Sequence, residues 1–401
     1  MANSKHTIEE LRQRQSLPLE AKIELTYARV RDWVDAYGIQ GVYISFSGGK
    51  DSTVLMDLIR NRYGYPDMKA MFVDVPTQYP ELKQFANTFD NVDIVKPKIS
   101  FMQVCEKYGF PLISKEVSEV VHGARQYVRE LRERGELPTG LIGNGGGEKG
   151  IEVTTNTNGF KALANMLNER MANKQGGQNL RLARLLGWST GNRETPIQVK
   201  EITPDFYRSQ FSCDRYKFFL DAPFELSDVC CRIMKKAPAH NYCKATGKVP
   251  ITAQMASESL LRRQQWLNHG CNAFDKKLPV SNPMSFWTEQ DVLEYIYINK
   301  LPICSVYGKV VPTDIQLTFD DAGFDTGNAP RKQYKTTGCH RTGCMLCGFG
   351  CHLEKSPNRF EQLKVTHPGV YGLLDKCKNN GVTFREAIEW TNEHGNMHIE
   401  L

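Results

Sequence analysis

The hexapeptide Ser47-Gly48-Gly49-Lys50-Asp51-Ser52 follows directly on the apolar run Val42–Phe46. The apolar run predicts a buried strand, and residues 53–59 predict the start of a helix. A tight glycine turn between a strand and a helix aims backbone N–H groups and a helix N-terminus at one point, which suits a phosphate group. The glycines let the backbone approach that phosphate closely. Lys50 adds a positive point charge, and Asp51 is placed to help hold a magnesium ion.

The spacing differs from that of the Walker loop, which needs four residues between its first glycine and Gly-Lys-Ser/Thr. The hexapeptide instead resembles the PP-loop of ATP pyrophosphatases, which cut ATP between the α and β phosphates. This resemblance implies catalytic roles for Lys50, Asp51 and Ser52, with Mg²⁺ accompanying the ATP. It implies a nucleotide-binding set made of Ser45, Ser47, Gly48, Gly49, Lys50, Asp51 and Ser52.

Composition sets the broad class of protein. A chain of 401 residues can bury a large core and form one large domain with an appendage, or two domains. The net charge of +6 permits an anionic ligand or a nucleic acid without demanding one. No apolar run approaches the roughly 20 residues of a membrane span, and we see no apolar signal core. We therefore expect a cytoplasmic protein without a membrane partner.

Further strands flank the glycine loop in the sequence. Residues 71–75 and 92–95 predict buried strands, and Pro80 opens a helix between them. Strands alternating with helices predict a doubly wound α/β fold with a parallel sheet, in which ligands bind beyond the carboxyl ends of the strands. Asp74 lies at such an end, where it could bind magnesium or a ribose hydroxyl, or serve as a structural cap.

We expect three divisions of the chain. Residues 1–37 predict N-terminal helices, residues 38–300 a PP-loop nucleotide-binding domain, and residues 301–401 a cysteine-rich region. A stretch of different character at about 114–187 interrupts the second division, with an amphipathic helix at 117–134, a glycine-rich segment and basic helices. We interpret this stretch as a helical insertion. Its charges indicate a solvated face, or a docking element for nucleic acid.

The 12 cysteines are many for a reducing compartment, where clustered cysteines suggest metal or redox chemistry rather than disulfides. Cys344 and Cys347 form a C-x2-C pair, flanked by Cys339 and Cys351. Four soft sulfur ligands favour zinc or an iron–sulfur cluster. His340 and His352 are candidates to replace a sulfur ligand. The isolated cysteines Cys105, Cys304 and Cys377 are expected to be small buried residues.

Several segments together resemble the phosphoadenosine phosphosulfate (PAPS) reductase family. They are the glycine loop, Val73-Asp74 with Tyr79-Pro80-Glu81, Ser257–Arg262, and the capped helix start Trp287-Thr288-x-x-Asp291. Arg262 and Arg263, in and next to the segment Ser257–Arg262, are candidate phosphate ligands, or else part of an exposed helix face. The vicinal pair Cys230-Cys231, with the later Cys344-x2-Cys347, is similar to the cluster signature of assimilatory adenylyl-sulfate reductases. The resemblance implies a [4Fe-4S] cluster on these four cysteines, with zinc as the alternative metal and Cys339, Cys351 and Cys271 as alternative ligands.

Two departures from the reductases point to a different substrate. The reductases carry a catalytic cysteine in a Glu-Cys-Gly-Leu-His sequence, whereas this chain ends in residues 394–401 without a cysteine. The reductases also lack the loop lysine, because their substrate has no β,γ-diphosphate, whereas Lys50 is present here. A lysine held where no phosphate binds would cost desolvation without benefit. We therefore expect ATP, with Lys50 on the leaving pyrophosphate.

An intact ATP loop beside a reductase-like cysteine pattern is similar to the ATP-pyrophosphatase component of DNA phosphorothioation systems and to PP-loop enzymes that thiolate tRNA. The resemblance implies adenylation of an acceptor oxygen that sulfur then displaces, with a cysteine desulfurase or another sulfur donor and a nucleic acid as partners. The acceptor itself is not specified by the sequence. One alternative is a sulfonucleotide reductase that uses Cys271 or Cys377. Another is a nucleotide-binding regulatory subunit of a nucleic-acid-modifying complex.

Overall fold

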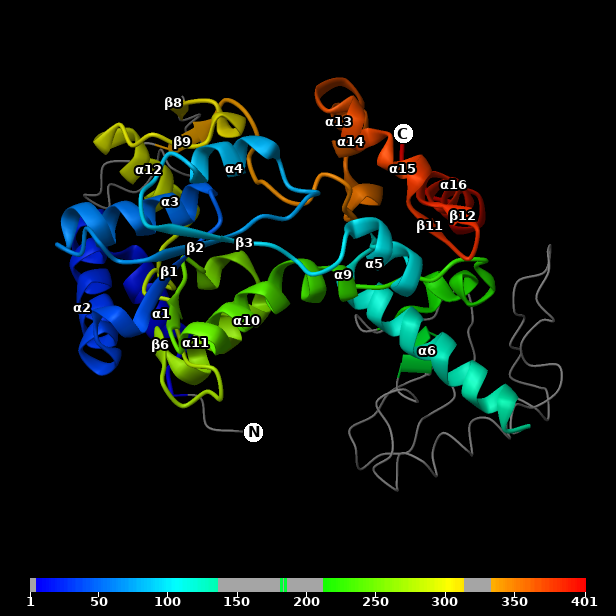
Figure 1. The fold of residues 1–401 in the computed structure, drawn as a ribbon, viewed down its shortest axis with the longest axis horizontal. Helices are drawn as coiled ribbons and strands as arrows, with labels where there is room; N and C mark the ends of the chain where they lie inside the picture. The colour runs from blue at the N-terminus through cyan, green and yellow to red at the C-terminus, as the bar shows by residue number, and fades with distance from the viewer. Residues whose placement is uncertain (1–4, 136–180, 183, 186–211, 314–332) are drawn as a thin grey trace, which may run out of the picture. The chain divides into compact units, whose positions relative to one another are not determined.

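The computed structural model describes residues 5–135, 181–182, 184–185, 212–313 and 333–401. They form two compact units, each made of two stretches of chain (Figure 1). The first unit comprises residues 1–98 and 234–344, and the second comprises residues 99–233 and 345–401. Each unit combines an early and a late stretch of the chain, and the divisions expected at 37 and 300 stay a prediction.

The first unit is built on a mainly parallel sheet of six strands in the order β3-β2-β1-β5-β7-β6. Strand β1, which the sequence predicts from its apolar run, lies between β2 and β5. Ile44 is opposite Ala70 of β2, and Val42 is opposite Val249 of β5. Only the pairing of β6 with β7 is antiparallel in this sheet. The strands are β1 (Val42–Phe46), β2 (Ala70–Val73), β3 (Val92–Val95), β5 (Val249–Ile251), β6 (Asn272–Ala273) and β7 (Val280–Ser281).

Both faces of this sheet are covered by helices. The central strand β1 is therefore buried on both faces, which explains why its residues form a continuous apolar run. Val42, Ile44 and Phe46 join the larger apolar cluster, which also holds Trp33 of α2. Tyr43 points to the opposite face and packs with Tyr242 of α10. The helices of this unit are α1 (Ile8–Ser16), α2 (Leu19–Tyr37), α3 (Lys50–Asp57), α4 (Pro80–Ala86), α10 (Ala237–Thr246), α11 (Leu260–His269) and α12 (Glu289–Asn299).

Shorter elements complete the first unit. Strands β8 (Val310–Thr313) and β9 (Gln333–Thr336) form an antiparallel pair. The 3-10 turns Ala256–Glu258 and Ser305–Tyr307 precede α11 and β8 respectively. A π-turn at Leu58–Arg62 extends α3. The α/β class with a mainly parallel central sheet, predicted from the sequence, is thus confirmed.

The second unit is mostly helical and is organised around α6 (Figure 1). The Arg125 guanidinium donates to the carbonyls of Ala222 and Phe224, fixing α6 to the chain after a 3-10 helix at Asp214–Asp221. Its helices are α5 (Phe101–Tyr108), α6 (Lys115–Glu133), α9 (Val229–Cys231), α13 (Arg359–Thr366), α14 (Pro368–Tyr371), α15 (Leu373–Lys376) and α16 (Phe384–Gly395). Its strands are β4 (Leu112–Ile113), β10 (Gly348–Phe349), β11 (Lys378–Asn379) and β12 (Val382–Thr383).

Helix α6 corresponds to the amphipathic helix expected at 117–134, and Ser114 is its N-cap. The glycine-rich segment and most of the basic helices of the expected insertion lie outside the described residues. None of the described helices is both long and apolar enough to cross a membrane.

Candidate nucleotide site

The glycine loop joins β1 to α3 in the first unit and has the strand–turn–helix form that the sequence predicts. Gly48 has φ of +72°, the left-handed region that favours glycine. A Cβ there would lie 3.1 Å from the Leu82 carbonyl oxygen, and a Cβ on Gly49 would lie 3.2 Å from the Tyr307 hydroxyl. Helix α3 begins at Lys50 without a side-chain cap, so its N-terminal dipole faces the loop.

Two serine hydroxyls hold the loop in shape. Ser52 Oγ accepts from the backbone N–H of Ser47 at 3.2 Å and lies 3.0 Å from Ser47 Oγ. Ser52 Oγ also contacts the Gly49 carbonyl at 2.9 Å, and the Gly49 N–H donates to Ser47 Oγ at 3.3 Å. The loop is therefore a closed, pre-organised turn, and Ser47 and Ser52 stabilise it from within.

Lys50 is the charged centre of the site. Its side chain is only 4% exposed, and Nζ lies 2.8 Å from Glu289 Oε1. Nζ also donates to the His340 carbonyl oxygen at 3.3 Å and sits 5.8 Å from the centre of the Tyr307 ring. A buried ammonium that is held by a carboxylate and a carbonyl is suited to exchange one of these oxygens for a phosphate oxygen.

Asp51 lies beside Lys50, with 3.9 Å between Oδ1 and Nζ. Burial raises the pKa of Asp51, and nearby Glu289 raises it further, whereas Lys50 and Arg341 act in the opposite direction. Asp51 Oδ1 is buried without a hydrogen-bond partner among the described residues. A buried carboxylate oxygen left without a donor fits a hard cation such as Mg²⁺, which takes oxygen ligands.

Helix α12 places Glu289 against Lys50. Thr288 is its N-cap and forms the predicted capping box with Asp291. Asp291 also accepts from the buried Lys22 of α2 at 2.6 Å. Tyr295 of the same helix donates to Asp57 of α3 at 2.6 Å. These contacts tie α12 to α2 and α3, so that Glu289, the first residue of α12, reaches the glycine loop.

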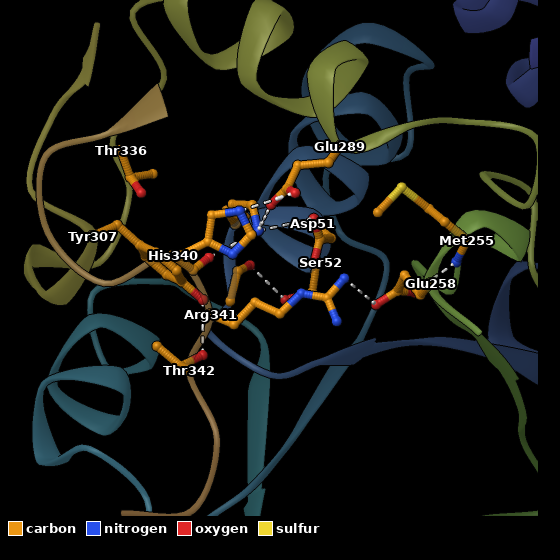
Figure 2. A network of polar contacts seen from close by, with 12 residues as sticks. Asp51, Ser52, Met255, Glu258, Glu289, Tyr307, Thr336, His340, Arg341 and Thr342 are labelled. Atoms are coloured by element: carbon orange, nitrogen blue, oxygen red, sulfur yellow. Dashed lines mark hydrogen bonds and ion pairs between the residues drawn. The ribbon is translucent and has the colours of Figure 1, made fainter. Parts of the chain in front are cut away.

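The segment Cys339–Cys344 contributes to the loop's surroundings (Figure 2). His340 Nε2 lies 3.2 Å from Glu289 Oε2, and Thr342 Oγ1 lies 2.8 Å from the Tyr307 hydroxyl. Cys344 bridges to Gln78, which fixes the end of the segment. His340, which the sequence offers as a candidate metal ligand, thus lies against Glu289 in the structure. The sequence signal that could have predicted a role for this segment near the glycine loop is the pair of basic residues His340-Arg341 within the cysteine motif.

A second group of charges lies next to Asp51. Glu258 accepts from the Arg262 guanidinium, and Glu258 Oε1 lies 4.0 Å from Arg341 Nη2. Burial lowers the pKa of Arg262, and the positive charge of Arg341 lowers it further, whereas Asp51 acts in the opposite direction. Arg262 was anticipated from the sequence, but Glu258 and Arg341 were not, because each is an ordinary charged residue in its own local pattern.

A pocket of about 220 Å³ opens beside the loop in this unit. Its walls include Ser45 and Ser47 from the end of β1, Gln78, and Thr342 of the Cys339–Cys344 segment. Asp74 is not part of its lining and instead pairs with Lys83 of α4 at 2.8 Å. Ser45 and Ser47 are thus placed at the carboxyl end of the strand, where α/β sheets bind ligands.

The four cysteines predicted to hold a metal lie in different units of the structure. Cys344 belongs to the first unit, while Cys230, Cys231 and Cys347 belong to the second. Among the residues that the structure describes, no three or more His, Cys, Asp or Glu side chains form a group that could hold a metal ion. The donor chemistry suits a soft metal, and the metal centre on these cysteines stays a prediction.

Of the other cysteines proposed from the sequence, Cys271, Cys351 and Cys377 are buried and Cys339 is half-buried. Cys351 donates to the Cys347 carbonyl oxygen at 3.3 Å, and burial raises its pKa. Cys339 Sγ lies 3.9 Å from the Tyr79 hydroxyl. Cys271 is 5% exposed and burial raises its pKa, and Cys377 is fully buried with a side-chain hydrogen bond to Cys105. Neither Cys271 nor Cys377 is open to a substrate as it stands.

Comparison with known proteins adds one finding. The family model of the phosphoadenosine phosphosulfate reductase domain matches residues 41–129 and 197–348, which together make up more than half of the chain. The match includes the glycine loop, Glu258, Arg262, Glu289 and the Cys339–Cys344 segment. A search of curated proteins finds none that matches.

Proposed function

The chain belongs to the phosphoadenosine phosphosulfate reductase domain family, and from that premise we propose that it is a PP-loop ATP pyrophosphatase. In this proposal it cleaves ATP to AMP and pyrophosphate and thereby activates an acceptor. The observation that carries the proposal is Lys50. A lysine 4% exposed at the start of α3, held by a carboxylate in place of a phosphate, suits a nucleotide with a β,γ-diphosphate.

The proposed reaction is a displacement at the α phosphorus. An acceptor oxygen, or water in simple hydrolysis, forms a bond to Pα, and the bond from Pα to the α,β-bridging oxygen breaks. The electron pair of that bond leaves with pyrophosphate, and the proton of the acceptor passes to solvent. Lys50 and the N-terminus of α3 stabilise the charge that develops on the leaving group. Ser47 and Ser52 keep the loop in the required shape.

Mg²⁺ fits the proposed site through Asp51, whose Oδ1 lacks a donor among the described residues. When bound, the ion would neutralise charge on the phosphates and act as a Lewis acid. Replacing Asp51 with Asn is therefore expected to weaken Mg²⁺-dependent ATP binding. ATP binding without Mg²⁺ should change much less.

For the acceptor we propose a nucleic-acid oxygen that sulfur later displaces, with a cysteine desulfurase or another sulfur donor as partner. This part follows from the family resemblance and the retained ATP loop. We also propose that Cys230, Cys231, Cys344 and Cys347 hold a [4Fe-4S] cluster or, alternatively, zinc. This metal centre has no assigned step in the proposed reaction. Anaerobic absorption with iron and zinc analysis tests it. A broad visible band that bleaches on reduction supports the cluster, and its absence from metal-free, active protein excludes it.

Substitution of Lys50 tests the proposed function. Lys50→Ala is expected to reduce pyrophosphate release from ATP by about a hundredfold or more, since one charge-stabilising group contributes about 3 kcal/mol. Lys277→Ala, which changes an exposed lysine of the same unit, serves as the matched control. Equal pyrophosphate release by Lys50→Ala and wild type contradicts the proposal.

The family name makes a sulfonucleotide reductase the enzymatic alternative. Such a reaction needs a thiolate that attacks the sulfur of the bound nucleotide, and Cys271 and Cys377 are both buried. Sulfite release from adenylyl sulfate or PAPS with a dithiol reductant distinguishes the two functions. Release that depends on either cysteine favours the reductase, whereas ATP cleavage without sulfite release favours the pyrophosphatase.

A further inference from the structure

A cavity of about 770 Å³ lies wholly within the second unit, whereas the glycine loop belongs to the first. Its lining comes from residues 113–117, from Arg184 with residues 212–216, and from Phe349, Gly350, His352 and Leu353. Residues 212–216 and 349–353 lie outside the insertion expected at about 114–187, and residues 349–353 also lie outside the family match. A cavity of this size can hold a ligand as large as a nucleotide.

A pair of parallel strands builds one wall of the cavity. Ile113 of β4 lies opposite Phe349 of β10, so both strands end at the same edge. Helix α6 follows β4 there, and the 3-10 turn Cys351–Leu353 follows β10. Helix α6 is 19 residues long and is capped by the Ser114 hydroxyl. The first backbone N–H groups of such a helix have no partner within the helix and suit an anion.

The uncompensated charge of the lining is positive. Of its two carboxylates, Glu116 pairs with Arg184 at 2.5 Å, and Asp214 is 7% exposed and accepts from a serine hydroxyl at 3.0 Å. Lys115 and Arg215 are both exposed, and neither has a carboxylate partner among the described residues. The cavity is therefore suited to a ligand that carries negative charge.

Arg215 is held flat against an aromatic ring. Its guanidinium lies over the Tyr216 ring, 4.6 Å from the ring centre, and donates to the Tyr216 hydroxyl. Tyr216 is buried, so it covers one face of the guanidinium while Arg215 itself stays exposed. A guanidinium plane fixed in this way is a surface on which a nucleic-acid base can stack.

The turn after β10 adds apolar surface and a free polar atom. Leu353 lines the cavity although it is 76% exposed, and Phe349 contributes an aromatic ring. His352 Nδ1 is buried and has no hydrogen-bond partner within the described part of the chain. Buried polar atoms are normally satisfied, so this nitrogen suits a polar group of a ligand. A bare phosphate would use none of the apolar surface, whereas a nucleotide would use both.

We infer that this cavity binds one nucleotide of a single-stranded nucleic acid. The start of α6 and Lys115 bind the phosphate, and the base stacks on Arg215. The inference rests on the proposed function for its choice of the acceptor nucleic acid as the ligand. A single strand is required, because the faces of a base within a duplex are already covered by its neighbours.

Fluorescence anisotropy tests this inference with the full-length protein and labelled single-stranded DNA and RNA of one mixed sequence. Arg215→Ala is expected to weaken binding of the strand that the wild type prefers about tenfold or more. Arg215→Lys should fall between, because lysine keeps the charge but loses the plane. Lys217→Ala is the matched control, since this exposed lysine lies on the same 3-10 helix and outside the lining. It should change the affinity less than about twofold.

Three results overturn the inference: a wild-type protein that binds neither strand, an Arg215→Ala protein with wild-type affinity, or an equal loss in Lys217→Ala. Leu353→Ser, at an exposed position that tolerates a polar residue, should also weaken binding and guards against misfolding of the arginine variant. Pyrophosphate release from ATP without nucleic acid should be unchanged in Arg215→Ala. A protein that binds the strand through Arg215 but releases no pyrophosphate retains this site and lacks the proposed function.

Discussion

At the residue scale, the contact between Lys50 and Glu289 defines the state of the site. Glu289 holds the lysine at 2.8 Å, and His340 holds the second oxygen of the same carboxylate at 3.2 Å. In the proposed function, Glu289 thus occupies the position beside Lys50 that a phosphate oxygen of the bound nucleotide would take. The negative charge of Glu289 would also repel the phosphates of ATP. Binding of ATP would therefore either displace this carboxylate or be weakened by the repulsion.

Replacing Glu289 with Gln should therefore strengthen ATP binding. The amide keeps the shape and an acceptor oxygen for Lys50 but removes the like charge. We expect the dissociation constant of α,β-methylene-ATP to fall about threefold to tenfold, a change of roughly 1 kcal/mol. Glu294→Gln on the same helix is the matched control. A weaker-binding Glu289→Gln protein would show that the carboxylate supports the nucleotide instead.

The same pair predicts how stability depends on pH. Burial acts to raise the pKa of Glu289, but Lys50, His340 and Arg341 together lower it below the ordinary value of 4.5. A carboxyl group with a lowered pKa stabilises the fold fully above pH 4.5, and the contribution is lost as the pH falls through the folded-state pKa. The difference in urea midpoint between wild type and Glu289→Gln should thus shrink below pH 4.5. A difference that is constant down to pH 3 contradicts this.

At the element scale, α12 is the part that brings distant residues to the loop. The buried ion pair between Lys22 and Asp291 joins its first turn to α2, and Trp287 donates to Thr26 at 2.9 Å just before it. The motif around Trp287 and Asp291 is therefore structural. Its function is to hold α12 at the angle that sets Glu289 against Lys50.

Breaking that ion pair should be costly. Asp291→Ala leaves the ammonium of Lys22 buried without its carboxylate, which typically costs about 3–5 kcal/mol of unfolding free energy. Urea denaturation measures it. The double variant Lys22→Met/Asp291→Leu removes both charges and should recover much of the loss. A cost below about 1 kcal/mol for the single variant would show that the pair does not anchor α12.

Local patterns in the sequence predict these elements well. The apolar run before the glycines predicts β1, and the spacing of Thr288 and Asp291 predicts the N-terminus of α12, because both features depend on near neighbours. The partners of the loop could not be predicted in this way. Lys50 and His340 are separated by 290 positions, and no periodicity encodes which distant charges meet.

At the scale of the whole molecule, the chain forms two units that each combine early and late stretches of sequence. The glycine loop and all of its described polar partners lie in the first unit, so the proposed ATP site belongs to that unit. The cysteines expected to bind metal are divided between the two units. The sequence could not reveal this division, because the spacing of residues along the chain does not show which folded unit each residue joins. Family membership, the α/β class, the loop and Arg262 were accessible from the sequence, whereas the positions of Glu289 and Arg341 beside the loop were not.

The position of the bond that breaks in ATP tests the account most directly. ATP labelled separately at the α and γ phosphates is incubated with the full-length protein and Mg²⁺, and the products are separated. The account predicts α label in AMP or in an adenylylated acceptor, and γ label in pyrophosphate, with both lost in Lys50→Ala. Label appearing in ADP and inorganic phosphate, or ATP left intact with every acceptor nucleic acid offered, would contradict it.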